Sequence, residues 1–269
     1  MTEPETSTVL SDLLKGQHAL VTGGGRGIGA AISDALAAHG AIITVVGRAV
    51  DTLVTRKEHV RKTFGVDVGI AAADVTREDE VEAAFAKAAR ERGPISLLVN
   101  NAGRGDSAPF KRTTTEFFQH MVDVNLLSTF LCIRQVMPAM TEAGYGRIIN
   151  VASTAGLVGY RYVSAYVAAK HAVVGLTRSL ALETAKTGIT VNAVCPSYVE
   201  TDMTADAIAN IVEKTGVDAT AARAQLVQAN PQGRLIQPTE IANVVIWLAK
   251  PDSGSITGQS IPIAGGEVM

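Results

Sequence analysis

Short runs of apolar, mostly β-branched residues alternate along this chain with longer segments in which apolar positions recur at helical spacing. Seven runs are predicted as strands, and their apolar residues are continuous rather than alternating, as expected where both faces of a sheet are covered. They span 18–21, 42–46, 66–71, 95–100, 147–151, 190–194 and Ser260–Ile263.

The clearest helical segment lies between the third and fourth strands. Val81, Ala84, Phe85 and Ala88 fall at i, i+3, i+4 and i+7, one face of an amphipathic helix that Gly93-Pro94 ends. Repeated strand–helix alternation predicts an α/β fold: a Rossmann-like, doubly wound parallel sheet of about seven strands with helices on both faces. We expect one catalytic domain over 15–269, preceded by a flexible arm over 1–14.

Composition narrows the function. The chain has 269 residues, a formal net charge of -2, two cysteines and five scattered histidines. This charge offers no basic field to nucleic acid, and the cysteines Cys132 and Cys195 cannot build a disulfide framework. We expect no metal and, because no signal sequence or apolar run of roughly 18 to 20 residues occurs, a cytoplasmic protein without a membrane partner.

A glycine-rich loop follows the first strand. It reads Thr22-Gly23-Gly24-Gly25-Arg26-Gly27-Ile28-Gly29, and a helical pattern begins directly after it. Glycines allow a tight turn and let backbone N–H groups approach a pyrophosphate at a helix N-terminus. A lone glycine-rich string is often a plain turn, but a strand before it and a helix after it indicate a dinucleotide site.

Tyr166 and Lys170 stand four residues apart, on one face of a helix. A general acid that protonates a carbonyl oxygen has to release its proton, and tyrosine, with an unperturbed pKa of about 10, releases it reluctantly. A neighbouring ammonium favours the phenolate, so we expect Lys170 and the bound oxidised dinucleotide together to lower the pKa of Tyr166. The spacing alone is common by chance, and other motifs have to support it.

Taken together, the Gly-x3-Gly-x-Gly loop, Asn100-Asn101-Ala102-Gly103 and Tyr166-Val167-Ala168-Ala169-Lys170 resemble the short-chain dehydrogenase/reductase family. The resemblance runs from about residue 16 to the C-terminus and is closest to 3-oxoacyl reductases and hydroxybutyrate dehydrogenases. It implies a hydride transfer between a nicotinamide and a carbonyl/alcohol pair.

The resemblance also implies four catalytic residues. Tyr166 is the acid/base, Lys170 supports it, Ser153 hydrogen-bonds the substrate oxygen, and Asn125 holds a water that links Lys170 to solvent. Tyr162, which has no lysine four residues later, is expected to be pocket wall or core.

The same resemblance implies a set of cofactor-binding positions. Asp74-Val75 is expected at the adenine, residues 101–103 near the ribose, and Thr201 at the nicotinamide carboxamide or the pyrophosphate. The full set is Gly23, Gly25, Arg26, Gly27, Ile28, Gly29, Arg48, Asp74, Val75, Asn101, Ala102, Gly103, Tyr166, Lys170, Pro196 and Thr201. Two positions depart from the family pattern: Ser197 replaces a glycine, which puts the local backbone conformation in doubt, and Ala264 replaces a common aspartate.

The second strand ends Val46-Gly47-Arg48, without the carboxylate that would bind the ribose 2′-OH of NAD. Arg48, with Arg26 in support, is suited to a 2′-phosphate. We therefore expect NADP(H) to be preferred, with NAD(H) possible. The alternative is that both arginines are solvated surface residues.

Residues 202–233 are predicted to form a helical lid over the substrate, broken near Thr215-Gly216. Its inner face would carry Ala205, Ile208, Ala209, Leu226 and Val227, opposite walls from Leu157, Val158, Tyr160 and Tyr198. Arg104, Lys111, Arg112 and Arg161 flank the expected mouth, where they either meet an anionic handle such as a CoA phosphate or are solvated.

Gly105, Ala155 and Val163 stand where a small carboxylate substrate would need polar partners. This disfavours free hydroxybutyrate and favours a 3-oxoacyl thioester or another hydrophobic ketone. Alternatives are an NAD-dependent secondary-alcohol or hydroxyacid dehydrogenase and a non-catalytic dinucleotide sensor. A sugar-nucleotide epimerase or dehydratase is disfavoured because it usually has a longer C-terminal domain. The resemblance further implies a homotetramer, with one interface from helices over 113–137 and from Ser164 onward, and another from the last strand.

Overall fold

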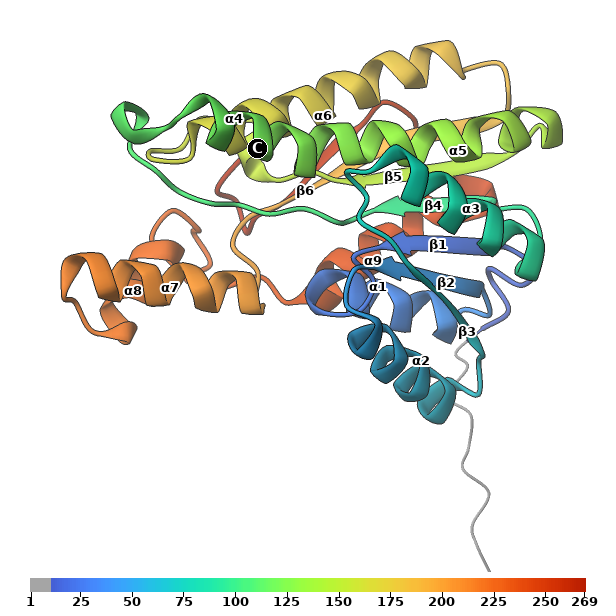
Figure 1. Ribbon diagram of the computed structural model, residues 1–269, viewed down its shortest axis with the longest axis horizontal. Coiled ribbons are helices and arrows are strands. Elements are labelled where there is room, and N and C mark those ends of the chain that lie inside the picture. The colour runs from blue at the N-terminus through green and yellow to red at the C-terminus, as the bar shows by residue number, and fades with distance from the viewer. Residues whose placement is uncertain (1–10) are drawn as a thin grey trace, which may run out of the picture.

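The computed structural model describes residues 11–269, which form one seven-stranded parallel sheet in the order β3-β2-β1-β4-β5-β6-β7 (Figure 1). The strands are β1 (His18–Thr22), β2 (Ile42–Gly47), β3 (Val68–Ala72), β4 (Leu97–Asn100), β5 (Gly146–Val151), β6 (Ile189–Pro196) and β7 (Ser260–Ile263). β2 and β3 are added on one side of β1, and β4 to β7 on the other side, so the order of the strands switches between β1 and β4. Ligands of such folds bind outside the carboxyl ends of the strands at this switch point.

All seven predicted strands are confirmed, and only their ends differ. β3 and β4 begin at Val68 and Leu97, two residues later than predicted, and β6 continues to Pro196. Every residue of β1, β4, β5 and β6 is buried, which is the reason why their apolar runs are continuous.

Helices cover both faces of the sheet, as predicted (Figure 1). One face packs against α1 (Gly27–Ala38), α2 (Val50–Phe64) and α9 (Pro238–Ala249), and the other against α3 (Glu78–Arg92), α5 (Ser128–Ala143) and α6 (Ser164–Glu183). The predicted apolar face of α3 is confirmed, because Val81, Ala84, Phe85 and Ala88 are its buried residues and Gly93 ends the helix with a φ of 85°.

The N-terminal boundary differs from the predicted arm over 1–14. Leu14 is fully buried in the core beside α1, and the N–H groups of Ser11 and Leu14 donate to the carbonyls of Ala38 and His39. Residues 11–14 are therefore held against the domain, because an apolar side chain anchors them. The remainder of the predicted arm, residues 1–10, lies outside the described residues.

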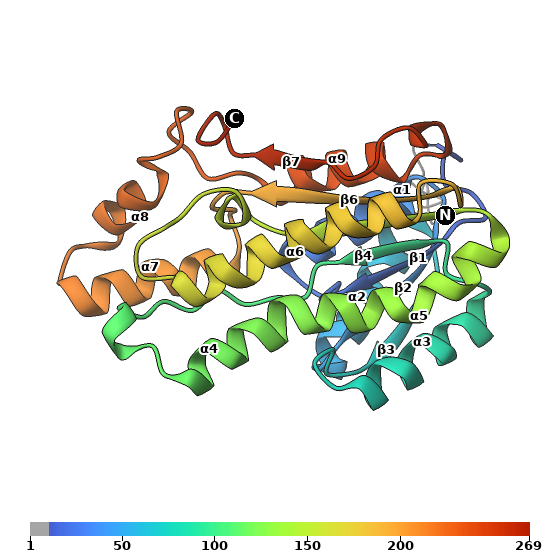
Figure 2. The same cartoon turned by 90° about the horizontal axis from the view of Figure 1, so that it is seen from above.

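The predicted lid consists of α7 (Asp202–Thr215) and α8 (Ala219–Val227), which extend beyond the carboxyl ends of the strands (Figures 1 and 2). Gly216 ends α7 in a left-handed conformation with a φ of 74°, at the predicted break. Ile208, Leu226 and Val227 are partly buried, but Ala205 and Ala209 are exposed, so the expected inner face is narrower than predicted. No helix between residues 11 and 269 is long and apolar enough to cross a membrane.

Candidate active site

Three connections at the carboxyl edge of the sheet bring the predicted catalytic residues together. Ser153 follows β5, Tyr166 and Lys170 lie in the first turns of α6, and Pro196 ends β6 beside them. The Ser153 hydroxyl donates to the Pro196 carbonyl at 3.4 Å and accepts from the N–H of Ala155 at 3.1 Å. These bonds hold the Ser153 side chain between the two strand ends.

Tyr166 is a protonated phenol in this site. Burial raises the pKa of Tyr166 to about 12, and a hydrogen bond with Ser153 acts in the opposite direction without compensating for it. A phenol in this state carries its proton throughout the neutral range, and its transfer to a carbonyl oxygen requires that the phenolate left behind be stabilised.

Lys170 is buried behind Tyr166. Its Nζ donates to the carbonyl of Val151 at 2.9 Å and lies 5.7 Å from the centre of the Tyr166 ring. Burial lowers the pKa of Lys170 to about 8. The expected lowering of the Tyr166 pKa by Lys170 is not present among the chain's own groups, since burial of the phenol outweighs every other influence.

Asn125 lies in a π-helical turn, Asp123–Leu127, between α4 (Thr115–Val122) and α5. Such single turns interrupt long helices frequently at functional sites. The Asn125 Nδ2 donates to the carbonyls of Met121 and Arg104, both at 2.9 Å, and its Oδ1 accepts from the Arg104 N–H at 3.2 Å. The amide thus holds the loop after β4 in place.

Gly103 is the residue that lets Asn125 and Lys170 approach each other. A β-carbon at Gly103 would lie 2.8 Å from Asn125 Oδ1 and 3.5 Å from Lys170 Nζ. The structure therefore places the Asn125 amide and the Lys170 ammonium on either side of one glycine. The water that the family resemblance assigns to Asn125 stays a prediction.

The glycine-rich loop is shaped to receive a pyrophosphate. A β-carbon at Gly29 would lie 2.2 Å from the carbonyl oxygen of Gly23, and Gly23 and Gly27 have φ values of 62° and 55°. The first turn of α1 has neither a capping side chain nor an acidic residue, so its N–H groups remain available to an anion. This loop fits the phosphates of a dinucleotide.

Asn101 connects this loop to β4. Its Nδ2 donates to the carbonyls of Thr22 and Gly23 at 3.0 and 3.1 Å, and the Thr22 hydroxyl accepts from the N–H groups of Asn101 and Ala102. The Asn101 side chain is thus engaged by the glycine loop, and the ribose expected here would meet Ala102 and Gly103.

Arg48 and Asp74 meet at the ends of β2 and β3. The Arg48 guanidinium is 75% exposed and lies 3.9 Å from the Asp74 carboxylate, whose other oxygen accepts from the N–H and hydroxyl of Thr76. Burial opposes ionisation of Asp74, but the Thr76 hydrogen bonds and the Arg48 charge together lower its pKa below the ordinary value. Val75 beside it is buried.

The connection from β6 to α7 closes the cofactor side of the site. Thr201 precedes α7, and its methyl group would lie 3.4 Å from a β-carbon at Gly27. Arg26 in the glycine loop pairs with Asp202 at 3.6 Å, a contact that no sequence motif indicated. Ser197 does not have a positive φ, so the doubt about its backbone is resolved: the serine fits without strain.

Of the predicted substrate walls, Leu157 and Tyr160 are partly buried, and Val158 and Tyr198 are each 38% exposed. A β-carbon at Gly105 would lie 3.6 Å from the Tyr166 ring. Of the two places predicted for Tyr162, pocket wall or core, the core is excluded, because the residue is 63% exposed, with a φ of 67°. The predicted flanking cations Arg104, Lys111, Arg112 and Arg161 are all exposed.

Sequence reasoning missed Glu267. Its carboxylate accepts hydrogen bonds from the hydroxyls of Tyr160 and Ser197. No motif includes this residue, and a contact across more than a hundred positions has no local signal.

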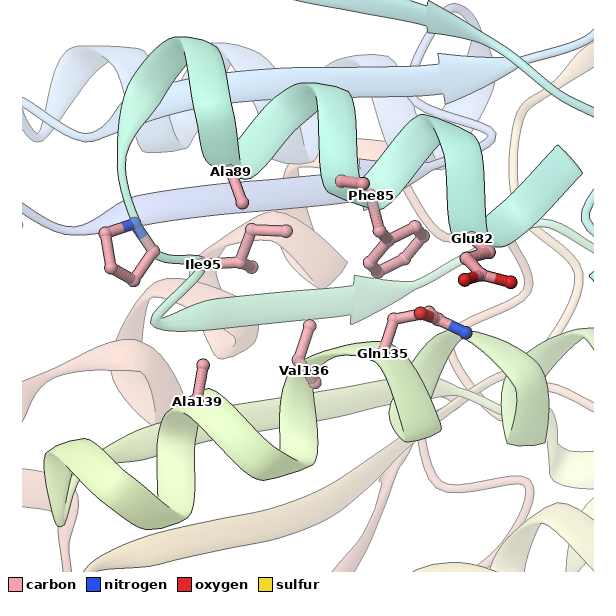
Figure 3. A pocket seen from close by; sticks show the side chains of 9 residues that line it. Glu82, Phe85, Ala89, Ile95, Gln135, Val136 and Ala139 are labelled. Carbon is pink, nitrogen blue, oxygen red and sulfur yellow. The ribbon is translucent and has the colours of Figure 1, made fainter. Parts of the chain in front are cut away.

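Two surface pockets lie away from these residues. One, of about 390 Å³, is an apolar depression between α3 and α5 that Phe85, Ile95 and Val136 line and Glu82 and Gln135 border (Figure 3). The other, of about 340 Å³, lies between α8 and the segment 233–237 that follows it. Among residues 11–269 no group of three His, Cys, Asp or Glu side chains is arranged to hold a metal ion.

Comparison with known proteins gives a consistent family. The family model described as short chain dehydrogenase matches residues 17–211. The chain is 38% identical over 257 residues to the D-beta-hydroxybutyrate dehydrogenase of Cupriavidus necator, covering 95% of this chain and 99% of the relative. It is also 38% identical over 251 residues to the acetoacetyl-CoA reductase of Shinella zoogloeoides, covering 93% and 97%.

A solved structure of an actinorhodin polyketide ketoreductase with NADPH superimposes with a TM-score of 0.90 and 38% identity, covering 93% of this chain and 97% of that one. The similarity extends over nearly the whole chain in both sequence and fold. It shows that this chain is an oxidoreductase that uses a nicotinamide dinucleotide. The chain belongs to the short-chain dehydrogenase family.

Proposed function

We propose that the protein is an NADP(H)-dependent reductase of neutral, fairly hydrophobic ketones in which Tyr166 delivers the proton. The observation that carries this proposal is the grouping of Ser153, Tyr166 and the buried Lys170 at the carboxyl ends of β5 and β6. A dinucleotide sensor has no need for these three residues together.

The nicotinamide, when bound, supplies the hydride. The chain's own residues bind the oxygen of the substrate. The Ser153 hydroxyl, which accepts from the Ala155 N–H, turns its one hydrogen from the Pro196 carbonyl to this oxygen and orients the carbonyl of the substrate. Tyr166 transfers its proton to this oxygen as negative charge develops there.

Lys170 and Asn125 support the proton transfer. The Lys170 ammonium, 5.7 Å from the ring centre, stabilises the phenolate that Tyr166 becomes after the transfer. With its pKa at about 8, this lysine is itself able to pass a proton on near neutral pH. Asn125 lies near Lys170 across Gly103, and in this proposal it holds the water that links Lys170 to solvent.

The preference for NADP(H) rests on the end of β2. Gly47 presents no carboxylate to the ribose, and the exposed Arg48 guanidinium stands beside Asp74, where the adenosine end is expected. Arg26 adds a second cation on the glycine loop. NAD(H) with a secondary alcohol or a hydroxyacid is the competing hypothesis, in which both arginines only pair with neighbouring aspartates.

The substrate class follows from the wall around Tyr166. Gly105 faces the ring, Ala155 is buried, and neither offers a polar group to a free carboxylate. By their names, the relatives above act on D-beta-hydroxybutyrate, on acetoacetyl-CoA and on a polyketide, so a ketone/alcohol pair is the common feature. We propose a 3-oxoacyl thioester or a comparable neutral ketone. Cytoplasmic localisation stays a prediction.

The test is a panel of ketones with NADPH, measured for the wild-type protein, Tyr166→Phe and Tyr162→Phe. Tyr166→Phe removes one hydroxyl, so NADPH binding should survive while turnover falls by about two orders of magnitude or more. Tyr162→Phe makes the same change at an exposed tyrosine and should retain wild-type turnover. More than about a tenth of wild-type turnover in Tyr166→Phe would exclude the proposed proton transfer.

A further inference from the structure

The C-terminal segment returns to the carboxyl edge of the sheet after β7. The N–H of Ser197 donates to the carbonyl of Ile263 at 3.1 Å, and the N–H of Glu267 donates to the carbonyl of Ala264 in the turn that follows. Figure 2 shows the C-terminus at the same end of the molecule as α7 and α8, beyond the tips of β6 and β7. Glu267 is therefore on the substrate side of the sheet.

Both carboxylate oxygens of Glu267 accept hydrogen bonds from hydroxyl groups. The Tyr160 hydroxyl donates to Oε1 and the Ser197 hydroxyl to Oε2. An ionised carboxylate is an acceptor at both oxygens, and this arrangement suits that form. No ion pair of residues 11–269 includes Glu267, so hydroxyl groups and not a cation hold it.

These donors lie next to the catalytic residues. Tyr160 also hydrogen-bonds the hydroxyl of Thr154 at 2.9 Å, and Thr154 directly follows Ser153. Ser197 directly follows Pro196, whose carbonyl accepts the Ser153 hydroxyl. Glu267 is thus two contacts away from the serine that would hold the substrate oxygen.

Tyr198 gives a second measure of this proximity. Burial raises the pKa of Tyr198 above its ordinary value, and the negative charge of Glu267 adds to the effect. Tyr198 in turn is one of the groups whose charge would disfavour the phenolate of Tyr166. The charge of Glu267 therefore acts on Tyr198, a residue that in turn lies close enough to Tyr166 to influence it.

We propose that Glu267 determines the charge preference of the enzyme: its carboxylate repels ketones that carry a free carboxylate near the reacting carbonyl and leaves neutral esters and thioesters unaffected. The inference rests on the proposed reduction of ketones. Like charges that face each other in a partly desolvated site are a common means of rejecting the wrong ligand.

The experiment compares acetoacetate with ethyl acetoacetate, which share the 3-oxo group and differ in charge. The ratio of kcat/KM for the anion to that for the ester is measured with NADPH at low and high salt for the wild-type protein, Glu267→Gln and Glu142→Gln. Glu267→Gln keeps a hydrogen-bonding side chain and removes the charge. Glu142→Gln makes the same charge change at an exposed residue of α5, near the end of β5 that lies opposite the catalytic residues.

We expect Glu267→Gln to raise the ratio about tenfold, through the anion and not the ester, and Glu142→Gln to leave it unchanged. Salt should raise the wild-type ratio and have little effect in Glu267→Gln, because screening acts only on the charge. A merely structural tail would instead lower turnover of both substrates together, and that outcome, or an unchanged ratio with normal ester turnover, contradicts the role of Glu267. Failure of the wild type to reduce the ester contradicts the proposed ketone reduction itself.

Discussion

Lys170 illustrates a conflict between stability and chemistry at a single residue. Its ammonium is 4% exposed, and burial lowers its pKa from 10.5 to about 8. That lowering corresponds to a cost of roughly 3 kcal/mol at most in the free energy of unfolding. One hydrogen bond to the Val151 carbonyl offsets only part of the cost. The residue is retained, in our proposal, because the phenolate of Tyr166 needs a cation beside it.

This predicts that Lys170→Met stabilises the fold while it abolishes turnover. Between pH 8 and 10.5 the unfolded chain binds more protons at Lys170 than the folded chain, so the penalty is fully present below pH 8 and disappears as the pH rises to 10.5. Thermal unfolding should therefore show Lys170→Met more stable by about 1–3 kcal/mol at pH 7, with a smaller difference at pH 9.5. Tyr166 is present in the wild type and in Lys170→Met, so its raised pKa does not contribute to the difference in stability between them.

Lys186→Met is the control, because Lys186 is exposed on the chain after α6 and carries no burial penalty. Its stability should stay within about 0.5 kcal/mol of the wild type at both pH values. A Lys170→Met protein that is less stable than the wild type at pH 7 would mean that the buried ammonium contributes to the fold.

At the level of elements, the carboxyl end of β2 governs the choice of cofactor. The strand ends at Gly47, and Arg48 follows it into the turn before α2. Gly47 has no positive φ, and a β-carbon there would approach only Leu53, at 3.4 Å from the flexible end of its side chain. The strand end therefore accepts a larger residue, and a glycine here is not required by the fold.

We predict that Gly47→Asp combined with Arg48→Ile reverses the preference from NADPH to NADH. The aspartate would accept from the ribose 2′-OH and repel a 2′-phosphate, and the loss of Arg48 removes a charge-assisted contact of about 1.5–3 kcal/mol. The wild-type preference for NADPH should accordingly be about ten- to hundredfold in KM. Salt should weaken this preference for NADPH, because the Arg48 charge is exposed and therefore screened.

The KM values of the wild-type protein for NADPH and for NADH are measured first. If the KM for NADH is equal to that for NADPH or lower, Arg48 is only a surface arginine. Arg61→Ile is the control. Arg61 is exposed in the last turn of α2, where loss of the same charge should not change either KM.

At the level of the whole molecule, apolar side chains remain exposed along one side. Phe118 of α4 and Phe130 of α5 are each 42% exposed, and Leu182 of α6 is 81% exposed. Figure 2 shows α4, α5 and α6 running next to one another along this side. An apolar face built from several helices is typical of a protein interface.

We predict a homotetramer of about 112 kDa, four chains of 28.1 kDa, in which these helices form one interface. Light scattering at micromolar concentration measures the mass. Phe130→Asp should lower it to that of a dimer or monomer, whereas Val54→Asp, on the outer side of α2, should leave it unchanged. A wild-type mass of one chain would refute the tetramer.

The strands and the layers were predictable from sequence alone, because they depend on local patterns, whereas the candidate catalytic group was implied by the resemblance to a family. Continuous apolar runs mark buried parallel strands, and the i, i+3, i+4, i+7 positions of α3 are buried as their spacing indicates. Likewise, Tyr166 and Lys170 share a face of α6 by helix geometry alone.

Only the tertiary structure decided what those residues experience. Burial is a property of the packed molecule, and in the chain alone it raises the pKa of Tyr166, whereas the predicted lowering involves Lys170 together with the oxidised dinucleotide. Leu14, Tyr162 and Glu267 took places that no local pattern indicates: one is in the core, one is in solvent, and one is beside Tyr160 and Ser197. The physical reason is that burial and contacts between distant segments are set when the whole chain packs, and not by the residues next to each position in the sequence.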